Sequence, residues 1–143
     1  MRGELAALAR HLHIDGRVRF LGWRPDALAI VAACDLFVMP SLWEGMPNAV
    51  MEAMALRRCV VATAVEGTTE LIESGRSGLL VPPRQVRRLA DAITVALTNP
   101  DRRAALGRAA RQRIADHFTI ERTVARYEAL YGDLLHGRGP TAP

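Results

Sequence analysis

The sequence predicts an α/β fold, in which a Rossmann-like parallel sheet with flanking helices is followed by an all-helical carboxyl-terminal segment. Short apolar stretches alternate with helix-forming stretches up to residue 82, which is the pattern of βα units. From residue 85 onward only helix-forming stretches remain. Aromatic residues make up 5% of the chain, so Ala, Leu, Val and Ile must fill the core, as suits helices that cover a parallel sheet.

The first helix is expected over residues 4–13, which are rich in Ala and Leu. An apolar stretch stopped by a glycine, residues 17–22, predicts the first strand. Asp26 is suited to cap a helix over 27–33. That helix leads into an apolar strand over 35–39, which ends in turn residues.

Pro47 is expected at the first position of the next helix, where its missing N–H is not needed, and good helix formers continue over 48–56. The β-branched stretch 59–63 predicts a strand that is buried on both faces. A short helix is expected to begin at Thr68 or Thr69 and to end at residue 73, before a Ser-Gly stop.

The last predicted strand, residues 78–83, is ended by two prolines. Three helices follow, separated by Asn99-Pro100 and by a cap at Thr119: residues 85–97, 100–117 and 119–135. We therefore expect one partial Rossmann-like domain over 1–136 and a disordered tail over 137–143.

The composition limits the classes of function. No apolar run approaches the ~18 residues that cross a bilayer, and the first residues do not open a signal peptide, which predicts a cytoplasmic location. Cys34 and Cys59 lack metal or redox spacing, so both are expected to be inert buried thiols. All 19 basic residues are arginine and the net charge is +4. The arginines between 84 and 126 fit a solvated helix face or a surface for anionic lipid, and interspersed acidic residues argue against a nucleic-acid partner.

Ligands of such sheets bind beyond the carboxyl ends of the strands. Four loops should converge there: residues 22–25, 41–48, 63–67 and 82–83. Glu44 lies in the second of these loops, and Glu52 lies inside the helix that follows it. The helix start offers unpaired N–H groups to a phosphate, and a carboxylate suits ribose hydroxyls. The residues alone also allow Glu52 to be a solvated helix residue and Glu44 a loop carboxylate.

Five stretches in sequence resemble the donor half of glycosyltransferase family four enzymes. They are RVRFLG at 17–22, ACDLFVMPS at 33–41, the E-x7-E pair Glu44 and Glu52 followed by AMA, VVAT at 60–63, and GRSGLLVPP at 75–83. The resemblance extends from about residue 4 to residue 135. It implies a GT-B fold, whose carboxyl-terminal half binds a nucleoside-diphosphate sugar, and a retaining hexosyl transfer that needs no metal ion or other cofactor.

The resemblance also assigns roles to individual residues. Glu44 would contact the donor sugar as the catalytic residue, and Glu52 would bind the ribose. Trp23 would stack on the base, although an apolar plug is an equal alternative. The whole donor-binding set implied by the resemblance is Glu52, Gly45, Met46, Pro47, Asn48, Ala49, Gly22, Trp23 and Arg24, with the diphosphate on the backbone amides around Asn48.

The sequence departs from the family pattern in three places. Pro47-Asn48 replaces a Gly-rich variant of the loop, which some relatives share. Glu66-Gly67 stands where many relatives have two glycines. Two strands that precede the first helix in relatives, and the basic residues that neutralise the departing diphosphate, have no counterpart here. We therefore expect a truncated donor half whose partners are a nucleotide sugar and a missing or separate acceptor-binding domain, with peripheral contact at the inner face of the membrane. The alternative is a non-catalytic interaction subunit that complements a separate acceptor-binding chain.

Overall fold

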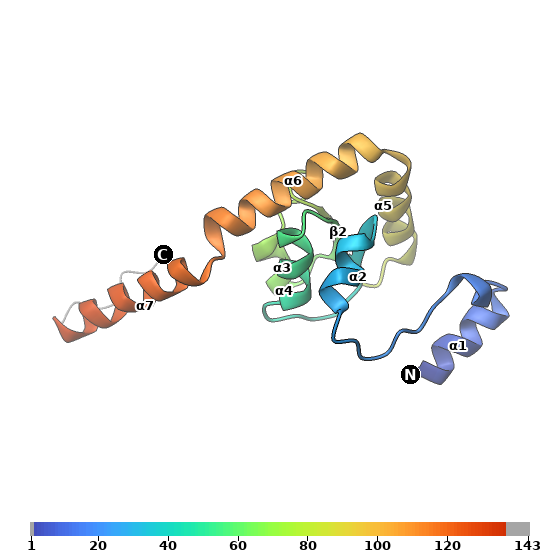
Figure 1. Ribbon diagram of the computed structural model, residues 1–143, viewed down its shortest axis with the longest axis horizontal. Coiled ribbons are helices and arrows are strands. Elements are labelled where there is room, and N and C mark those ends of the chain that lie inside the picture. Colours follow the sequence, from blue (N-terminus) through green and yellow to red (C-terminus); the bar gives the residue numbers. More distant parts are fainter. Residues whose placement is uncertain (1, 137–143) are drawn as a thin grey trace.

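The computed structural model describes residues 2–136 and builds them around one small parallel sheet (Figure 1). The three strands are β1 (Leu36–Met39), β2 (Cys59–Thr63) and β3 (Leu79–Val81), in the order β1-β2-β3. Both pairings are parallel. This sheet with its flanking helices confirms the predicted α/β fold, whereas the predicted tail over 137–143 lies outside the described residues.

Seven α-helices accompany the strands in the described part of the chain: α1 (Arg2–His11), α2 (Ala27–Ala33), α3 (Asn48–Ala55), α4 (Glu66–Leu71), α5 (Val86–Thr98), α6 (Pro100–His117) and α7 (Ile120–Leu135). Figure 1 shows that α1 and α7 lie at opposite ends of the molecule, away from the sheet. From α5 to the last described residue the structure has only helices, as predicted.

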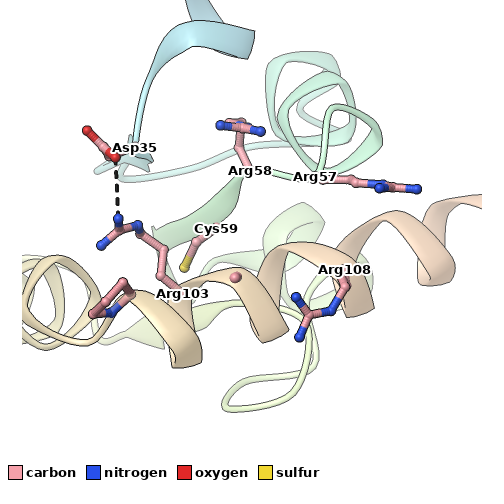
Figure 2. Close-up of a pocket in the computed structure, with 8 residues that line it drawn as sticks. Asp35, Arg57, Arg58, Cys59, Arg103 and Arg108 are labelled. Atoms are coloured by element: carbon pink, nitrogen blue, oxygen red, sulfur yellow. Dashed lines mark hydrogen bonds and ion pairs between the residues drawn. The ribbon is translucent and has the colours of Figure 1, made fainter.

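Helix α6 runs along the sheet, and its arginine side chains form hydrogen bonds with the segment before β1 and with α4. Arg103 donates to Asp35, just before β1, at 3.3 Å (Figure 2). The side chain of Arg113 reaches α4 and donates to the Leu71 carbonyl at 2.6 Å. Asn99 accepts a hydrogen bond from the Arg102 amide at 3.0 Å and so caps α6, which begins at the predicted residue 100.

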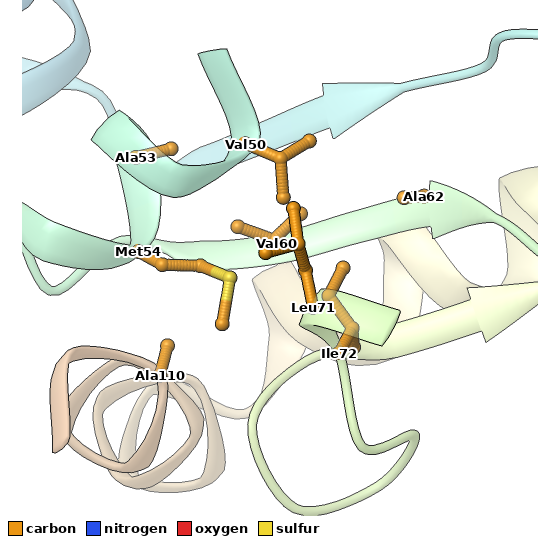
Figure 3. Packing of buried hydrophobic residues seen from close by; sticks show 8 residues of the cluster. All are labelled: Val50, Ala53, Met54, Val60, Ala62, Leu71, Ile72 and Ala110. Atoms are coloured by element: carbon orange, nitrogen blue, oxygen red, sulfur yellow. The ribbon is translucent and has the colours of Figure 1, made fainter. Parts of the chain in front are cut away.

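The core lies on both faces of β2, because successive side chains of a strand point to opposite sides. One cluster combines Val60 and Ala62 with Met54 of α3, Leu71 of α4 and Ala110 of α6 (Figure 3). The other cluster combines Cys59 and Val61 with Ala96 of α5 and Leu106 of α6. Since all residues of β2 are buried, the expectation of a strand covered on both faces is confirmed.

The predicted strand over 17–22 is absent. The structure has a short 3-10 helix, Asp15–Arg17, and no strand pairing over 18–22. A strand needs a neighbour for its backbone N–H and C=O groups, and in the described residues this segment has only one long-range hydrogen bond, from Arg2 to the Phe20 carbonyl at 3.3 Å. Val18 and Leu21 are accordingly exposed.

Other local predictions also needed correction. Pro47 is the N-cap of α3 rather than its first helical residue. The helix expected from 68 or 69 begins at Glu66, because the Thr68 hydroxyl accepts a hydrogen bond from the Val65 amide at 3.0 Å. Asp26 precedes α2 but makes no side-chain cap.

The two cysteines differ from each other in burial. Cys59 is buried as expected, but Cys34 is exposed, and its Sγ contacts the Ile30 carbonyl at 3.2 Å. Cys34 ends α2, on the side that carries exposed residues such as Ala33 and Asp35. The apolar stretch around it therefore did not determine its burial.

Candidate functional site

Three of the four predicted loops meet at the carboxyl-terminal end of the sheet. The Thr63 hydroxyl donates to the Ser41 carbonyl, and the Ala64 amide donates to the Val81 carbonyl at 2.7 Å. The Gly67 amide donates to the Glu44 carbonyl at 3.2 Å. A cavity of about 130 Å³ lies here, lined by Pro40, Leu42, Thr63, Pro82, Arg84, Gln85, Val86 and Leu89.

Glu44 is half-buried in the loop between β1 and α3. Its Oε1 atom accepts a hydrogen bond from the Ser41 hydroxyl at 2.6 Å. No hydrogen bond of the described residues uses its other carboxylate oxygen. A carboxylate that is held at one oxygen and free at the other is well placed to accept a hydrogen bond from a ligand hydroxyl.

The start of α3 presents two unpaired backbone donors. The amides of Val50 and Met51 both donate to the Pro47 carbonyl, at 3.0 and 3.2 Å. The amides of Asn48 and Ala49 have no acceptor among the described residues, and no side chain caps this helix. Unpaired amides and the positive end of the helix dipole together favour an anion at this position.

Glu52 lies on the same face of α3 as Asn48, because residues four apart in a helix are neighbours. Its side chain is exposed and makes no hydrogen bond or ion pair with the described residues. The helix start is therefore flanked by two carboxylates, Glu44 before it and Glu52 one turn inside it. Gly45 and Met46, between Glu44 and α3, are exposed, while Pro47 is buried.

The predicted base-binding residues are not joined to this loop. Gly22 adopts a left-handed backbone conformation with φ 67°, and Trp23 is 87% exposed. Arg24 makes two hydrogen bonds of 2.7 Å each to the carboxylate of Asp26, and this bond lowers the pKa of Asp26. No hydrogen bond or ion pair of the described residues links Gly22, Trp23 or Arg24 to Glu44 or Glu52.

Sequence reasoning missed three residues at this end of the sheet. Ser41 holds Glu44, and its place three residues before that glutamate was the available signal. Gly67 lets α4 approach the loop, since a Cβ atom there would lie 1.7 Å from the Gly45 carbonyl oxygen. Arg84 brings a positive charge to the cavity, on a left-handed backbone with φ 62° that no sequence pattern indicated.

Comparison with known families decides the identity of the chain. Residues 1–99 match the family described as "Glycosyl transferases group 1". This match covers well over half of the 143 residues. The chain belongs to this family.

Two relatives of this group 1 chain have different names. It is 31% identical over 128 residues to N-acetyl-alpha-D-glucosaminyl L-malate synthase of Bacillus anthracis. The aligned part covers 90% of this chain and 34% of the relative. It is 30% identical over 124 residues to UDP-Gal:alpha-D-GlcNAc-diphosphoundecaprenol alpha-1,3-galactosyltransferase of Escherichia coli, covering 87% and 32%. The chain thus spans about a third of the length of these relatives.

A solved structure shares the fold of this group 1 chain. Anabaena Alr3699/HepE in complex with UDP superposes with a TM-score of 0.83 at 30% identity, over 89% of this chain and 36% of that one. The same protein has been solved with UDP-glucose. The neighbours support a GT-B-like fold for the described residues.

Two further features are absent from residues 2–136 of the group 1 chain. No group of three or more His, Cys, Asp or Glu side chains there has the geometry to hold a metal ion. None of the helices described in this range is both long enough and apolar enough to cross a membrane.

Proposed function

We propose that residues 1–136 are the donor-binding half of a glycosyltransferase of the family-four type. In this proposal they bind a nucleoside-diphosphate sugar for retaining transfer of a hexose to a glycan or glycolipid acceptor. The observation that carries the proposal is the start of α3, where two unpaired amides lie between two carboxylates. The likeness to HepE, which has been solved with UDP and with UDP-glucose, supports it.

The amides of Asn48 and Ala49 hold the diphosphate in this proposal. A helix N-terminus attracts negative charge through its unpaired N–H groups and its dipole. The loop that leads to these amides consists of Gly45, Met46 and Pro47. In this proposal no metal ion takes part in binding the diphosphate. Because α3 packs on β2 through Val50 and Met54, the donors are supported by the core.

Glu52 is proposed to bind the ribose. Its position four residues after Asn48 places its carboxylate on the same side of α3 as the phosphate donors. A carboxylate accepts hydrogen bonds from two neighbouring hydroxyl groups, and Glu52 has no competing partner among the described residues. Trp23 remains the proposed stacking partner of the base, because its indole is exposed and makes no hydrogen bond with the described residues.

Glu44 is proposed to be the catalytic residue that contacts the donor sugar. Ser41 orients its carboxylate through one oxygen, which leaves the other oxygen for a sugar hydroxyl. The Gly67 amide fixes the backbone of the same residue through the Glu44 carbonyl. Side chain and backbone of Glu44 are thus both held by residues of this end of the sheet.

Replacing Glu52 by Ala tests the ribose assignment. We expect the affinity for UDP, measured by calorimetry, to fall by roughly 10-fold or more, because hydrogen bonds to a charged group contribute ~1.5–3 kcal/mol. Glu70→Ala is the matched control, since Glu70 is also an exposed glutamate on a helix, α4. Equal affinities of the Glu52 variant and the unchanged chain would refute the assignment. Absence of heat with every UDP, GDP and ADP sugar, on folded protein, would refute the donor-binding proposal itself.

Replacing Ser41 by Ala tests the positioning of Glu44. Losing one hydrogen bond costs about 0.5–1.5 kcal/mol, so we expect the affinity for UDP-glucose to fall by roughly 3- to 10-fold while the affinity for UDP changes little. Thr94→Ala is the control, because it removes a hydroxyl that donates within α5 at 2.9 Å. A uniform loss for UDP and UDP-glucose would contradict a specific role at the sugar.

The exposed apolar stripe of α7 favours an acceptor half as partner. Its members are Val124, Tyr127, Leu130, Tyr131 and Leu134. Such a stripe is typical of a helix that packs against another surface. The acceptor half is either part of the same protein or a separate chain, and in the second case this chain is an interaction subunit. Co-purification with that chain, and turnover only in the complex, would identify the second case.

The place of action that we propose is the cytoplasm, with peripheral contact at the inner face of the membrane. The name of the Escherichia coli relative includes a diphosphoundecaprenol acceptor, which supports a lipid-linked acceptor as one possibility within the proposed class. The relatives differ in the acceptors that their names contain, so the proposal extends to the class of acceptor and no further.

A further inference from the structure

A second cavity lies at the other end of the sheet, where β1 and β2 begin. It has a volume of about 330 Å³, within the range of ~300–1,000 Å³ that is usual for small-molecule sites. The residues around it come from the start of β1, the α3–β2 turn, β2 and α6 (Figure 2). They are Asp35, Arg57, Arg58, Cys59, Pro100, Arg103, Ala104 and Arg108.

The lining of this cavity is strongly positive. It contains four arginines and a single carboxylate, Asp35, which is paired with Arg103. Burial raises the pKa of Cys59, against the smaller opposing effects of Arg103 and Arg102, so its thiol stays neutral. Since neither Cys59 nor any second acid compensates the remaining guanidinium groups, an anion is the ligand that this cavity favours.

Two of the four arginines are fixed in place by the protein itself. Arg58 donates to the carbonyls of Leu56 and Cys34 at 3.1 and 3.0 Å. Arg103 donates to the carbonyls of Ala96 and Leu97 at 3.1 Å each, besides its contact with Asp35. These bonds hold both charges at the wall of the cavity.

The other two arginines have no partner in the described residues. Neither Arg57 nor Arg108 makes a side-chain hydrogen bond or ion pair there, although both line the cavity. They come from different elements, Arg57 from the α3–β2 turn and Arg108 from α6, and the Arg57 side chain extends away from Arg103 (Figure 2). Their N–H groups are therefore available to a ligand.

Arg57 occupies a backbone position that favours glycine. Its φ is 59°, and the amides of Arg57 and Arg58 donate to the carbonyls of Met54 and Ala53 at 3.0 and 2.9 Å, the pattern of a Schellman helix end. An arginine at such a left-handed position costs stability relative to glycine. A role of the Arg57 side chain would account for an arginine at this unfavourable backbone position.

Gly107 brings α6 against the same turn. A Cβ atom at this position would lie 2.2 Å from the Arg57 carbonyl oxygen. The close approach places the α6 arginines, Arg103 and Arg108, opposite Arg57 and Arg58. The four charges are thus gathered by helix packing rather than spread over one exposed helix face.

We propose that this cavity binds a phosphate group, carried by a small metabolite or by a lipid headgroup. Arg57 and Arg108 donate hydrogen bonds to the phosphate oxygens, and the fixed charges of Arg58 and Arg103 strengthen the attraction. Guanidinium groups match phosphate geometry with paired N–H donors. This site lies at the opposite end of the sheet from the proposed donor site and does not depend on it.

Nuclear magnetic resonance of the full chain tests the proposal residue by residue. Inorganic phosphate and pyrophosphate are titrated at about 0.15 M ionic strength, where exposed charges are screened over ~8 Å. We expect saturable shifts of the backbone amides of Cys59 and Ala104. Shifts confined to Asn48 and Ala49 would place the anion at the start of α3 and overturn the proposal.

Two variants separate ligand binding from folding. Arg57→Gly removes one guanidinium and relieves the left-handed backbone, so we expect phosphate affinity to fall about tenfold while Tm stays the same or rises. Arg108→Gln is expected to weaken binding to a similar extent. The control is the double variant Arg87→Gln with Arg122→Gln, which removes two exposed charges outside the cavity. An equal loss in this control would show diffuse charge attraction and overturn the proposal.

Vesicle sedimentation distinguishes the two sources of phosphate. Binding to phosphatidylglycerol vesicles but not to phosphatidylcholine vesicles, lost in Arg57→Gly, would support a lipid headgroup. Saturable shifts with pyrophosphate and no vesicle binding would support a soluble phosphorylated metabolite. If neither shifts at Cys59 and Ala104 nor vesicle binding were observed, the proposal would be overturned.

Discussion

Gly67→Ala is expected to lower the free energy of unfolding by about 2–3 kcal/mol and Tm by roughly 5–12 °C. The added Cβ would lie 1.7 Å from the Gly45 carbonyl oxygen and 3.0 Å from Cδ of Pro47. Backbone atoms cannot yield as a flexible side chain does, so α4 must move away from the loop. That movement also breaks the hydrogen bond from the Gly67 amide to the Glu44 carbonyl.

The same substitution should weaken nucleotide binding, because the loop that moves leads into the unpaired amides of Asn48 and Ala49. Thermal unfolding and UDP calorimetry on one preparation measure both effects. Gly16→Ala is the control, since a Cβ there meets nothing within 4 Å. If Gly67→Ala left both Tm and UDP affinity unchanged, the close contact between α4 and the loop would not exist in solution.

Gly107→Ala is expected to lower stability by about 2–3 kcal/mol as well, although alanine is the better helix former. The added Cβ would lie 2.2 Å from the Arg57 carbonyl oxygen, so α6 would have to withdraw from the α3–β2 turn. Leu106 and Ala110, on either side of Gly107, are buried in the two core clusters and would be pulled from them.

Gly132→Ala in α7 is the matched control for this second prediction. It is the same change within a helix, but a Cβ at this position meets nothing within 4 Å. We expect it to stabilise the chain by about 0.5–1 kcal/mol, the usual gain of alanine over glycine in a helix. Urea unfolding of both variants measures the difference. Stabilisation of both variants would contradict the packing of α6 on the turn.

For several elements, the bounds predicted from local sequence signals agree with those in the structure. Strand β2, Cys59–Thr63, is a β-branched stretch of strand length, and all its residues are buried. Helix α6 begins at Pro100, as the Asn-Pro pair predicts, and the Asn99 side chain caps it. These predictions succeeded because neighbours in sequence make the decisive contacts.

The predictions that failed depended on distant contacts. Residues 17–22 have a strand pattern, yet no described strand pairs with them, so they form no strand. The pairing of Arg24 with Asp26 was not predicted either, and the place of Arg24 beside a nucleotide base stays a prediction. The exposure of Cys34 likewise followed from how α2 packs and not from the apolar residues around it.

The sequence by itself determined the α/β class, the family resemblance, and the position of Glu44 and Glu52 on either side of a helix start. Each of these depends on residue type and spacing along the chain. Only the tertiary structure decided that Ser41 holds Glu44, that Gly67 supports its loop, and that four arginines surround a cavity at the other end of the sheet. The physical reason is that these contacts join elements that meet only when β1, α3, α4 and α6 have packed around β2.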